Sequence, residues 1–162
     1  MVSRVAIYVI MRDEDGRILL QQRHNTGYLD GFYDFACSGH VDPGESIHDA
    51  AIRELAEEIG IFAQSQDLKL VHINQNYMDF PYINFTFELS KWQGTPRIAE
   101  PEKCSDLAYF DQNDLPERCT LNVRLNEQNG FAHDLRYSKV TLDDFTEIMG
   151  GTFEELTGKK LS

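Results

Sequence analysis

Apolar, β-branched and aromatic residues occur in short runs along this chain, and such runs between polar turns predict β-strands. The first two runs, RVAIYVIM and RILLQQR, are joined by the turn DEDGR, which indicates a hairpin. A third run, FYDFAC, predicts a short buried strand. The predicted strands cover residues 4–11, 17–23, 32–37, 68–77, 82–92 and 106–111.

A helical period replaces this pattern in the middle of the chain. Ser46 followed by Asp49 is typical of a helix start, and Gly60 stands where a left-handed residue ends a helix. Further helices are predicted over residues 120–128 and 142–156. Apolar residues between the two ends of the middle helix recur at every fourth position and form one face: Ile47, Ala51, Leu55 and Ile59.

The order of these elements predicts the fold class. Strands with one long helix in mid-chain and further helices at the end are typical of an α/β fold, with layers packed around a mixed sheet. The predicted loops at residues 24–31 and 38–46 connect strands to each other and to the helix. A length of 162 residues suits one domain with a hydrophobic core, so we expect a single domain over residues 1–162.

Composition and charge narrow the class of protein. Hydrophobic residues make up 41% and charged residues 26%, and no apolar run approaches the roughly 20 residues that cross a bilayer. The apolar run near the N-terminus ends in charges without a small-residue cleavage site, so we expect no signal peptide and a cytoplasmic location. The net charge of −12 disfavours nucleic acids and anionic membranes as partners. The negative charge still allows an anionic small molecule as substrate if a divalent cation lies between the substrate and the protein.

The cysteines do not form a recognisable site. Cys37, Cys104 and Cys119 are odd in number and lack CxxC or CxxH spacing, which argues against disulfide bonds and against a zinc site. We expect three free, buried thiols.

Three glutamates gather on the predicted middle helix. Steps of about 100° per residue place Glu54, Glu57 and Glu58 within an arc of about 100°, beside the apolar face. Like charges at this spacing repel by roughly 0.2–0.5 kcal/mol per pair. A glutamate-rich helix is usually a solvated face, but this one has no lysine and follows a loop rich in glycine and proline. Oxygen ligands of this kind suit Mg²⁺, so the cluster indicates a metal site.

The spacing of these residues resembles a known family. Gly39, Glu45 and the segment RELAEEIGI at 53–61 match G-x5-E-x7-REU-x-EE-x-GU, in which U is aliphatic. This is the motif of the Nudix hydrolase family, and the chain looks MutT-like. The resemblance is strongest over residues 4–130, and a C-terminal helical extension at about 138–160 lies beyond it.

The resemblance implies an α/β/α sandwich and a hydrolase that uses Mg²⁺ or Mn²⁺ to cleave a nucleoside diphosphate linked to another group, X. It implies that Glu57 and Glu58 are the main metal ligands and that Glu54 is a further ligand or the general base. The Gly39 carbonyl would be another ligand. Arg53 and Glu45 look like the pair that orients these side chains, and we expect Glu45 to fold back toward Arg53.

The resemblance also indicates residues outside the motif. Some relatives use one more acidic residue from a later loop, as ligand or base, and Glu100 and Glu102 are the candidates here. Arg23 is a candidate phosphate ligand, with a surface ion pair as the alternative. Tyr77 stands 16 residues after Ile61, where hydrolases of dinucleoside polyphosphates often carry a tyrosine, although packing is the commoner role of such a residue.

Several activities remain open for group X. The short chain and the WQGTP turn favour a nucleoside triphosphate pyrophosphohydrolase, including those that remove oxidised nucleotides. Hydrolysis of dinucleoside polyphosphates or of another nucleoside diphosphate derivative is the alternative. Other classes are a Nudix module that senses nucleotides without chemistry and a prenyl diphosphate isomerase, for which Cys37 is the cysteine to consider. The sequence leaves the oligomeric state open, a homodimer included.

Overall fold

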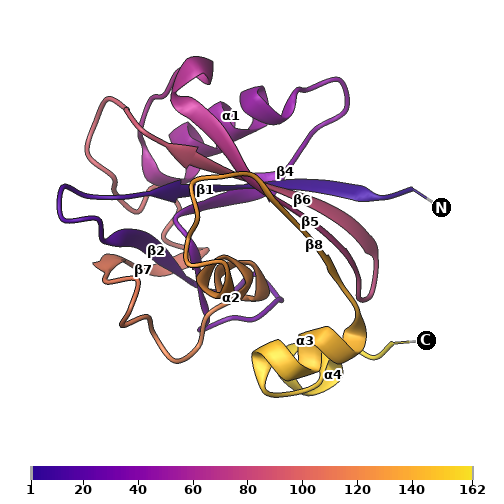
Figure 1. The fold of residues 1–162 in the computed structure, drawn as a ribbon. Coiled ribbons are helices and arrows are strands. Elements are labelled where there is room, and N and C mark those ends of the chain that lie inside the picture. Colours follow the sequence, from indigo (N-terminus) through magenta and orange to yellow (C-terminus); the bar gives the residue numbers. More distant parts are fainter. Residues whose placement is uncertain (1, 162) are drawn as a thin grey trace.

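The computed structural model describes residues 2–161, which form two β-sheets and four α-helices (Figure 1). The strands are β1 (Arg4–Met11), β2 (Ile18–Arg23), β3 (Tyr33–Phe35), β4 (Cys37–His40), β5 (Leu68–Tyr77), β6 (Pro81–Leu89), β7 (Cys104–Phe110) and β8 (Arg136–Val140). The helices are α1 (Ile47–Ile59), α2 (Leu121–Gln128), α3 (Leu142–Met149) and α4 (Phe153–Thr157), with a 3-10 turn η1 (Ser65–Asp67).

The larger sheet is mixed, as the sequence predicted. Its strand order is β4-β1-β6-β5-β8, in which β1 pairs in parallel with β6, and β5 with β8. The smaller sheet has the order β3-β2-β7 and is antiparallel. Helix α1 lies over one face of the larger sheet and α2 lies on the other side, while α3 and α4 follow β8 (Figure 1). The α/β class with helices on both sides of a mixed sheet is therefore confirmed.

Helix α1 begins and ends where the sequence predicted. The Ser46 side chain accepts a hydrogen bond from the Asp49 backbone N–H at 3.0 Å, and Gly60 adopts a left-handed φ of 68°. The apolar face of α1 packs against the larger sheet, where Leu55 meets the core that contains Ile7 of β1. This packing fixes the rotation of the helix, and hence the direction in which its glutamates point.

Some predicted boundaries were wrong. Residues 32–37 contribute to two strands, β3 and β4, and β4 runs on through Ser38 and Gly39, which the sequence placed in a loop. The strand predicted over 82–92 begins at Pro81 and ends at Leu89, and that over 106–111 runs from Cys104 to Phe110. A short strand of small residues has too few apolar side chains to be predicted from the sequence. Strand β4 is recognised only by its pairing with β1.

The C-terminal segment also differs from the prediction. The helix predicted over 142–156 is two helices, because Gly150 ends α3 in a left-handed conformation (φ 75°) and Thr152 caps α4. Residues 138–140, predicted as the start of a helical extension, belong to β8. This strand lies at the sheet edge, is mostly exposed and is largely polar, so no hydrophobic alternation marks it.

The three cysteines are free and buried, as expected. Within residues 2–161, no helix is long and apolar enough to cross a membrane.

One buried histidine gives the fold a pH dependence. His72 on β5 is fully buried, its Nε2 lies 2.9 Å from Ser138 Oγ, and burial lowers the pKa of His72 to about 4. An unfolded histidine titrates near 6.5, so between about pH 6.5 and 4 the unfolded state binds more protons than the folded state. We expect the free energy of unfolding to fall as the pH is lowered through this window.

Urea unfolding at pH 7 and pH 5 checks this expectation. The His72→Asn variant should lose less stability on acidification than the parent protein, whereas His24→Asn, at an exposed histidine, should behave like the parent. An equal acid-induced loss in all three proteins would show that His72 does not cause the pH dependence.

Candidate active site

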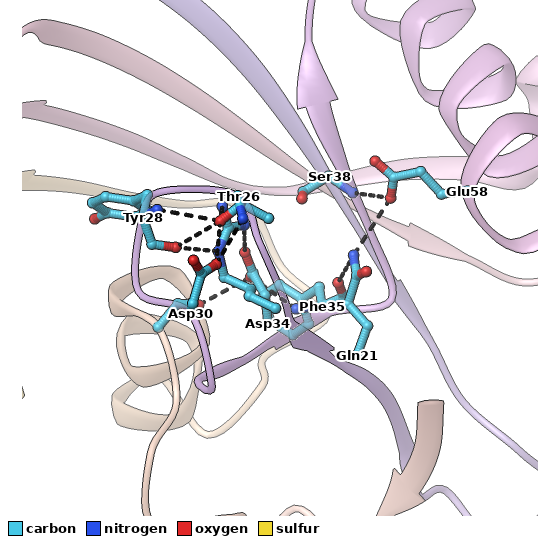
Figure 2. A network of polar contacts seen from close by, with 10 residues as sticks. Gln21, Thr26, Tyr28, Asp30, Asp34, Phe35, Ser38 and Glu58 are labelled. Carbon is cyan, nitrogen blue, oxygen red and sulfur yellow. Dashed lines mark hydrogen bonds and ion pairs between the residues drawn. The ribbon is translucent and has the colours of Figure 1, made fainter. Parts of the chain in front are cut away.

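Strand β4 and helix α1 together build the candidate site. The Ser38 backbone N–H donates to Glu58 Oε2 at 3.2 Å, and the Gln21 side-chain amide donates to the same oxygen at 3.4 Å (Figure 2). Gly39, the next residue on β4, lies directly against the Glu54 carboxyl group, so closely that an added Cβ would overlap it. A side chain at position 39 would therefore displace the Glu54 carboxyl group.

Arg53 links the carboxylates of this region. Its Nε and Nη2 donate to the two oxygens of Glu45 at 2.9 and 3.0 Å, a bidentate pair. Its Nη1 lies 2.8 Å from Glu54 Oε1 and 3.4 Å from Glu57 Oε2, and Nη2 also donates to the His40 carbonyl at 3.1 Å. Hydrogen bonds from Arg53 lower the pKa of Glu45 to about 2, and those with Glu45 and Glu54 raise the pKa of Arg53. The structure thus brings Arg53 and Glu45 together.

The three glutamates of α1 differ in environment. Burial, and after it the charge of Glu54, raises the pKa of Glu58 well above its usual value. The Glu54 side chain is 14% exposed, whereas that of Glu57 is 56% exposed. Carboxylates this close repel each other unless a proton or a cation lies between them.

These residues fit a hard divalent cation. The carboxylate oxygens of Glu54, Glu57 and Glu58 are donors of the kind that such a cation takes. Within residues 2–161, no three His, Cys, Asp or Glu side chains are gathered closely enough to hold an ion as they stand. Glu54 and Glu57 are both paired with Arg53 instead. The roles of these residues toward a metal therefore belong to the proposal below.

A cavity of about 680 Å³ adjoins the glutamates. Gly39, Glu54, Glu57 and Glu58 line it, and so does Glu100, whose carboxylate lies 3.8 Å from Lys103 Nζ. Glu102 is exposed and does not line this cavity. Of the two later acids, the structure places only Glu100 at the site.

Arg23 lines the cavity, and its acidic neighbour is a buried residue, so it does not form a surface ion pair. Its Nη1 lies 3.6 Å from the buried Asp34, and its Nε donates to the Tyr28 carbonyl at 2.7 Å. The loop that carries Tyr28 is held by Thr26, whose hydroxyl donates to Asp30 at 2.6 Å (Figure 2). These contacts hold Arg23 and Tyr28 at one side of the cavity.

Tyr77 is not brought to the site. It is 52% exposed and does not line the cavity, because alternation along β5 directs it away from the face that carries the buried Asn76. The structure therefore does not bring Tyr77 to the cavity beside the glutamates.

Four buried asparagines that were not predicted as site residues line the cavity. Asn74 and Asn76 of β5, Asn84 of β6 and Asn122 of α2 are all buried, and all line it. The alternating polar residues in HINQNY were a signal for this polar cavity. A strand that buries asparagines on one face needs polar contacts on that face.

Replacement of Gly39 tests how closely β4 and α1 must approach. We expect Gly39→Ala to displace the Glu54 carboxyl group and to lower any metal-dependent turnover by about 10–100-fold. Ser38→Ala, at the neighbouring residue, keeps the backbone N–H that Glu58 accepts and should have little effect. Turnover assays and thermal melts of the two variants make the comparison. Unchanged turnover in Gly39→Ala would show that the position of Glu54 is not critical.

The site of this α/β protein is a cluster of carboxylates. Glu54 and Glu58 of α1 contact β4, Arg53 contacts Glu54 and Glu57, and all three glutamates line the cavity. The model of the NUDIX domain matches residues 2–128. The chain therefore belongs to the Nudix family.

Individual relatives agree with this assignment. The chain is 35% identical over 117 residues to an uncharacterised Nudix hydrolase from Rhodococcus erythropolis, covering 66% of this chain and 62% of the relative. It is 31% identical over 121 residues to an isopentenyl-diphosphate Delta-isomerase from Serratia proteamaculans, covering 72% of this chain and 66% of the relative. The chain thus spans less than two thirds of the Rhodococcus protein's length.

A solved structure shares the fold. The MutT Nudix hydrolase from Burkholderia pseudomallei superposes with a TM-score of 0.71 at 26% identity, covering 79% of this chain and 98% of that chain. The MutT-like resemblance seen in the sequence is therefore confirmed.

Proposed function

We propose that this protein is a hydrolase that uses Mg²⁺ or Mn²⁺ to cleave the diphosphate linkage of a nucleoside diphosphate derivative. A nucleoside triphosphate is the favoured substrate, oxidised nucleotides included, and a dinucleoside polyphosphate or another derivative is the alternative. The observation that carries the proposal is the contact of Arg53 with Glu45, Glu54 and Glu57 at the edge of the cavity. A glutamate-rich helix face that only contacts solvent does not require an arginine with hydrogen bonds to three carboxylates.

The residues of α1 and β4 have distinct roles in this proposal. Glu57 and Glu58, with Glu54 and the Gly39 carbonyl, would hold the cation. A bound divalent ion supplies positive charge that neutralises the phosphates and acidifies water. Arg53 and Glu45 keep the carboxylates in place, which resembles the outer-shell support common at metal sites.

The reaction is a hydrolysis at phosphorus. Water attacks one phosphorus of the diphosphate bridge, the bond from this phosphorus to the bridging oxygen breaks, and the other phosphate leaves. A carboxylate at the site, Glu54 or Glu100, accepts the proton of the water. Arg23 and Lys103 line the cavity and can donate to phosphate oxygens. The cations also explain how a protein of net charge −12 binds a polyanion.

The isomerase named among the relatives is a different class of function. Cys37, the cysteine considered for it, is completely buried in the core under α1, and burial raises its pKa well above the usual value. It does not line the cavity. A core thiol of this kind does not support acid–base chemistry on a substrate in the cavity.

A substrate screen tests the proposal, in which the readouts are pyrophosphate, phosphate freed from the monophosphate products by an added phosphatase, and, for isopentenyl diphosphate, the isomer formed. The substrates are nucleoside triphosphates, oxidised dNTPs, ADP-ribose, dinucleoside polyphosphates, nucleotide sugars and isopentenyl diphosphate, each with Mg²⁺, with Mn²⁺ and with EDTA. We expect turnover of at least one nucleotide with metal and none with EDTA. Binding of nucleotides without any turnover would instead identify a sensor module.

A further inference from the structure

The face of the larger sheet opposite α1 is polar where it lines the cavity. Asn74 on β5 stands directly beside Asn84 on β6, and Asn84 stands beside Ala6 on β1. Asn122 of α2 lines the same cavity. All three asparagines are no more than 5% exposed. Three buried amides therefore converge on this part of the cavity from two strands and a helix.

These amides are not fully hydrogen-bonded within the protein. Among residues 2–161, both polar atoms of the Asn74 side chain and the Oδ1 atoms of Asn84 and Asn122 are buried without a partner. Unpaired amides destabilise a fold, so native proteins rarely keep them without a role.

Polar groups deeper on the same face are paired. The Asn122 amide nitrogen donates to Thr86 Oγ1 at 3.0 Å, and His72 lies 2.9 Å from Ser138. The Asn126 side-chain amide donates to the backbone carbonyl of Asn122 at 2.9 Å. His72, Thr86 and Asn126, which do not line the cavity, are paired, whereas the unpaired amide atoms belong to residues that line it. This difference indicates that a ligand completes the free amides.

The chemistry of the free atoms restricts the ligand. Amides are neutral and present a donor and an acceptor side by side, which matches the planar edge of a nucleobase. A phosphate is bound better by the cations of the cavity wall, Arg4, Arg23, Lys103 and Lys159, than by neutral amides. A prenyl tail would leave the amides unpaired. Tyr8, Tyr28 and Tyr82 also line the cavity and offer aromatic rings beside a base.

The C-terminal segment completes this part of the cavity. Phe153 of α4 and Lys159 line it, and the ring of Phe153 lies 6.4 Å from that of Tyr28. Lys159 Nζ lies 5.2 Å from the Tyr28 ring and 3.5 Å from Asp79. The segment after residue 140 therefore forms a wall of the cavity.

We propose that Asn74, Asn84 and Asn122 form the subsite that hydrogen-bonds the nucleobase of the substrate. This proposal rests on the proposed function and deepens it, because it assigns the cavity to a base and not to a prenyl chain. The asparagines act in recognition and lie apart from the glutamates that would hold the cation.

The test compares ATP, CTP, GTP and UTP with ribose 5′-triphosphate, which has no base. In the parent protein, we expect kcat/KM for the best nucleotide to exceed that for ribose 5′-triphosphate. Asn74→Leu, of similar shape but without polar atoms, should lower kcat/KM for that nucleotide by about 10–100-fold, mainly through KM. Its turnover of ribose 5′-triphosphate should not change. Asn84→Leu should have the same effects on the two kinds of substrate. It replaces Asn74→Leu in the test if that variant does not fold.

Gln75→Leu is the matched control. Gln75 precedes Asn76 on the same strand, does not line the cavity and accepts a hydrogen bond from Tyr137 at 2.8 Å, so its loss should not alter selectivity. Equal losses on both kinds of substrate, or none, in the asparagine variants would overturn the subsite. A parent protein that hydrolyses nucleotides and ribose 5′-triphosphate equally well would also overturn it and leave the proposed function standing. No hydrolysis of any of these compounds would instead count against the triphosphatase itself.

Discussion

Glu57→Gln is expected to lose metal-dependent release of pyrophosphate or phosphate by about 10³-fold while keeping its fold. The Glu57 side chain is 56% exposed and makes one long contact, 3.4 Å, with Arg53, so the fold depends little on its charge. The proposed function does depend on it, because a neutral amide is a poor ligand for Mg²⁺ and cannot offset its charge. The variant therefore separates a metal-binding role from a structural one.

The measurement combines turnover with direct metal binding. Mn²⁺ binding, followed by electron paramagnetic resonance or calorimetry, should weaken together with turnover, and the melting temperature should change little. Glu127→Gln is the matched control, because Glu127 is also a helical glutamate paired with an arginine, at 3.0 Å from Arg124. Normal turnover and Mn²⁺ binding in Glu57→Gln would remove the basis of the proposed function.

Arg53→Lys should reduce turnover by about 10–100-fold even though the charge is kept. The guanidinium contacts Glu45 through two nitrogens and also reaches Glu54, Glu57 and the His40 carbonyl. A lysine has a single nitrogen and cannot form this planar set of contacts. The carboxylates would then be less firmly placed.

A double-mutant cycle distinguishes positioning from a general loss of charge. If Glu45 acts through Arg53, Glu45→Gln should lower turnover by itself but add little to Arg53→Lys. Arg124→Lys, on α2, replaces another partly buried helical arginine and should leave turnover unchanged. Additive losses in the double variant would show that Glu45 and Arg53 act independently.

The candidate metal site could be predicted from local sequence. Ser46, Gly60 and the four-residue apolar recurrence define α1 within one short segment, because helix capping and amphipathicity depend on near neighbours. The contacts of Arg53 with Glu45 and Glu57 follow from the same segment. The different burial of the three glutamates did not follow, because it depends on how β4 and β2 pack beside the helix.

Residues outside the motif were harder to predict. Glu100 and Glu102 are equivalent in the sequence, yet only Glu100 lines the cavity. Tyr77 was chosen from its spacing alone, whereas the pleat of β5 directs it outward. Spacing along the chain determines which residues share a strand, but the pairing of that strand determines which face meets a cavity.

The sequence by itself determined the strands with strong apolar patterns, the extent of α1 and the Nudix motif, because each depends on interactions between residues close in the chain. Only the tertiary structure decided the position of β8, the break between α3 and α4, and the cavity where Asn74, Asn84 and Asn122 meet. Asn122 is far in the sequence from the other two, and the alternation of polar residues around Asn74 does not by itself show that the three meet. Sheet pairing and helix packing bury them together, and their burial is what makes their unpaired amides informative.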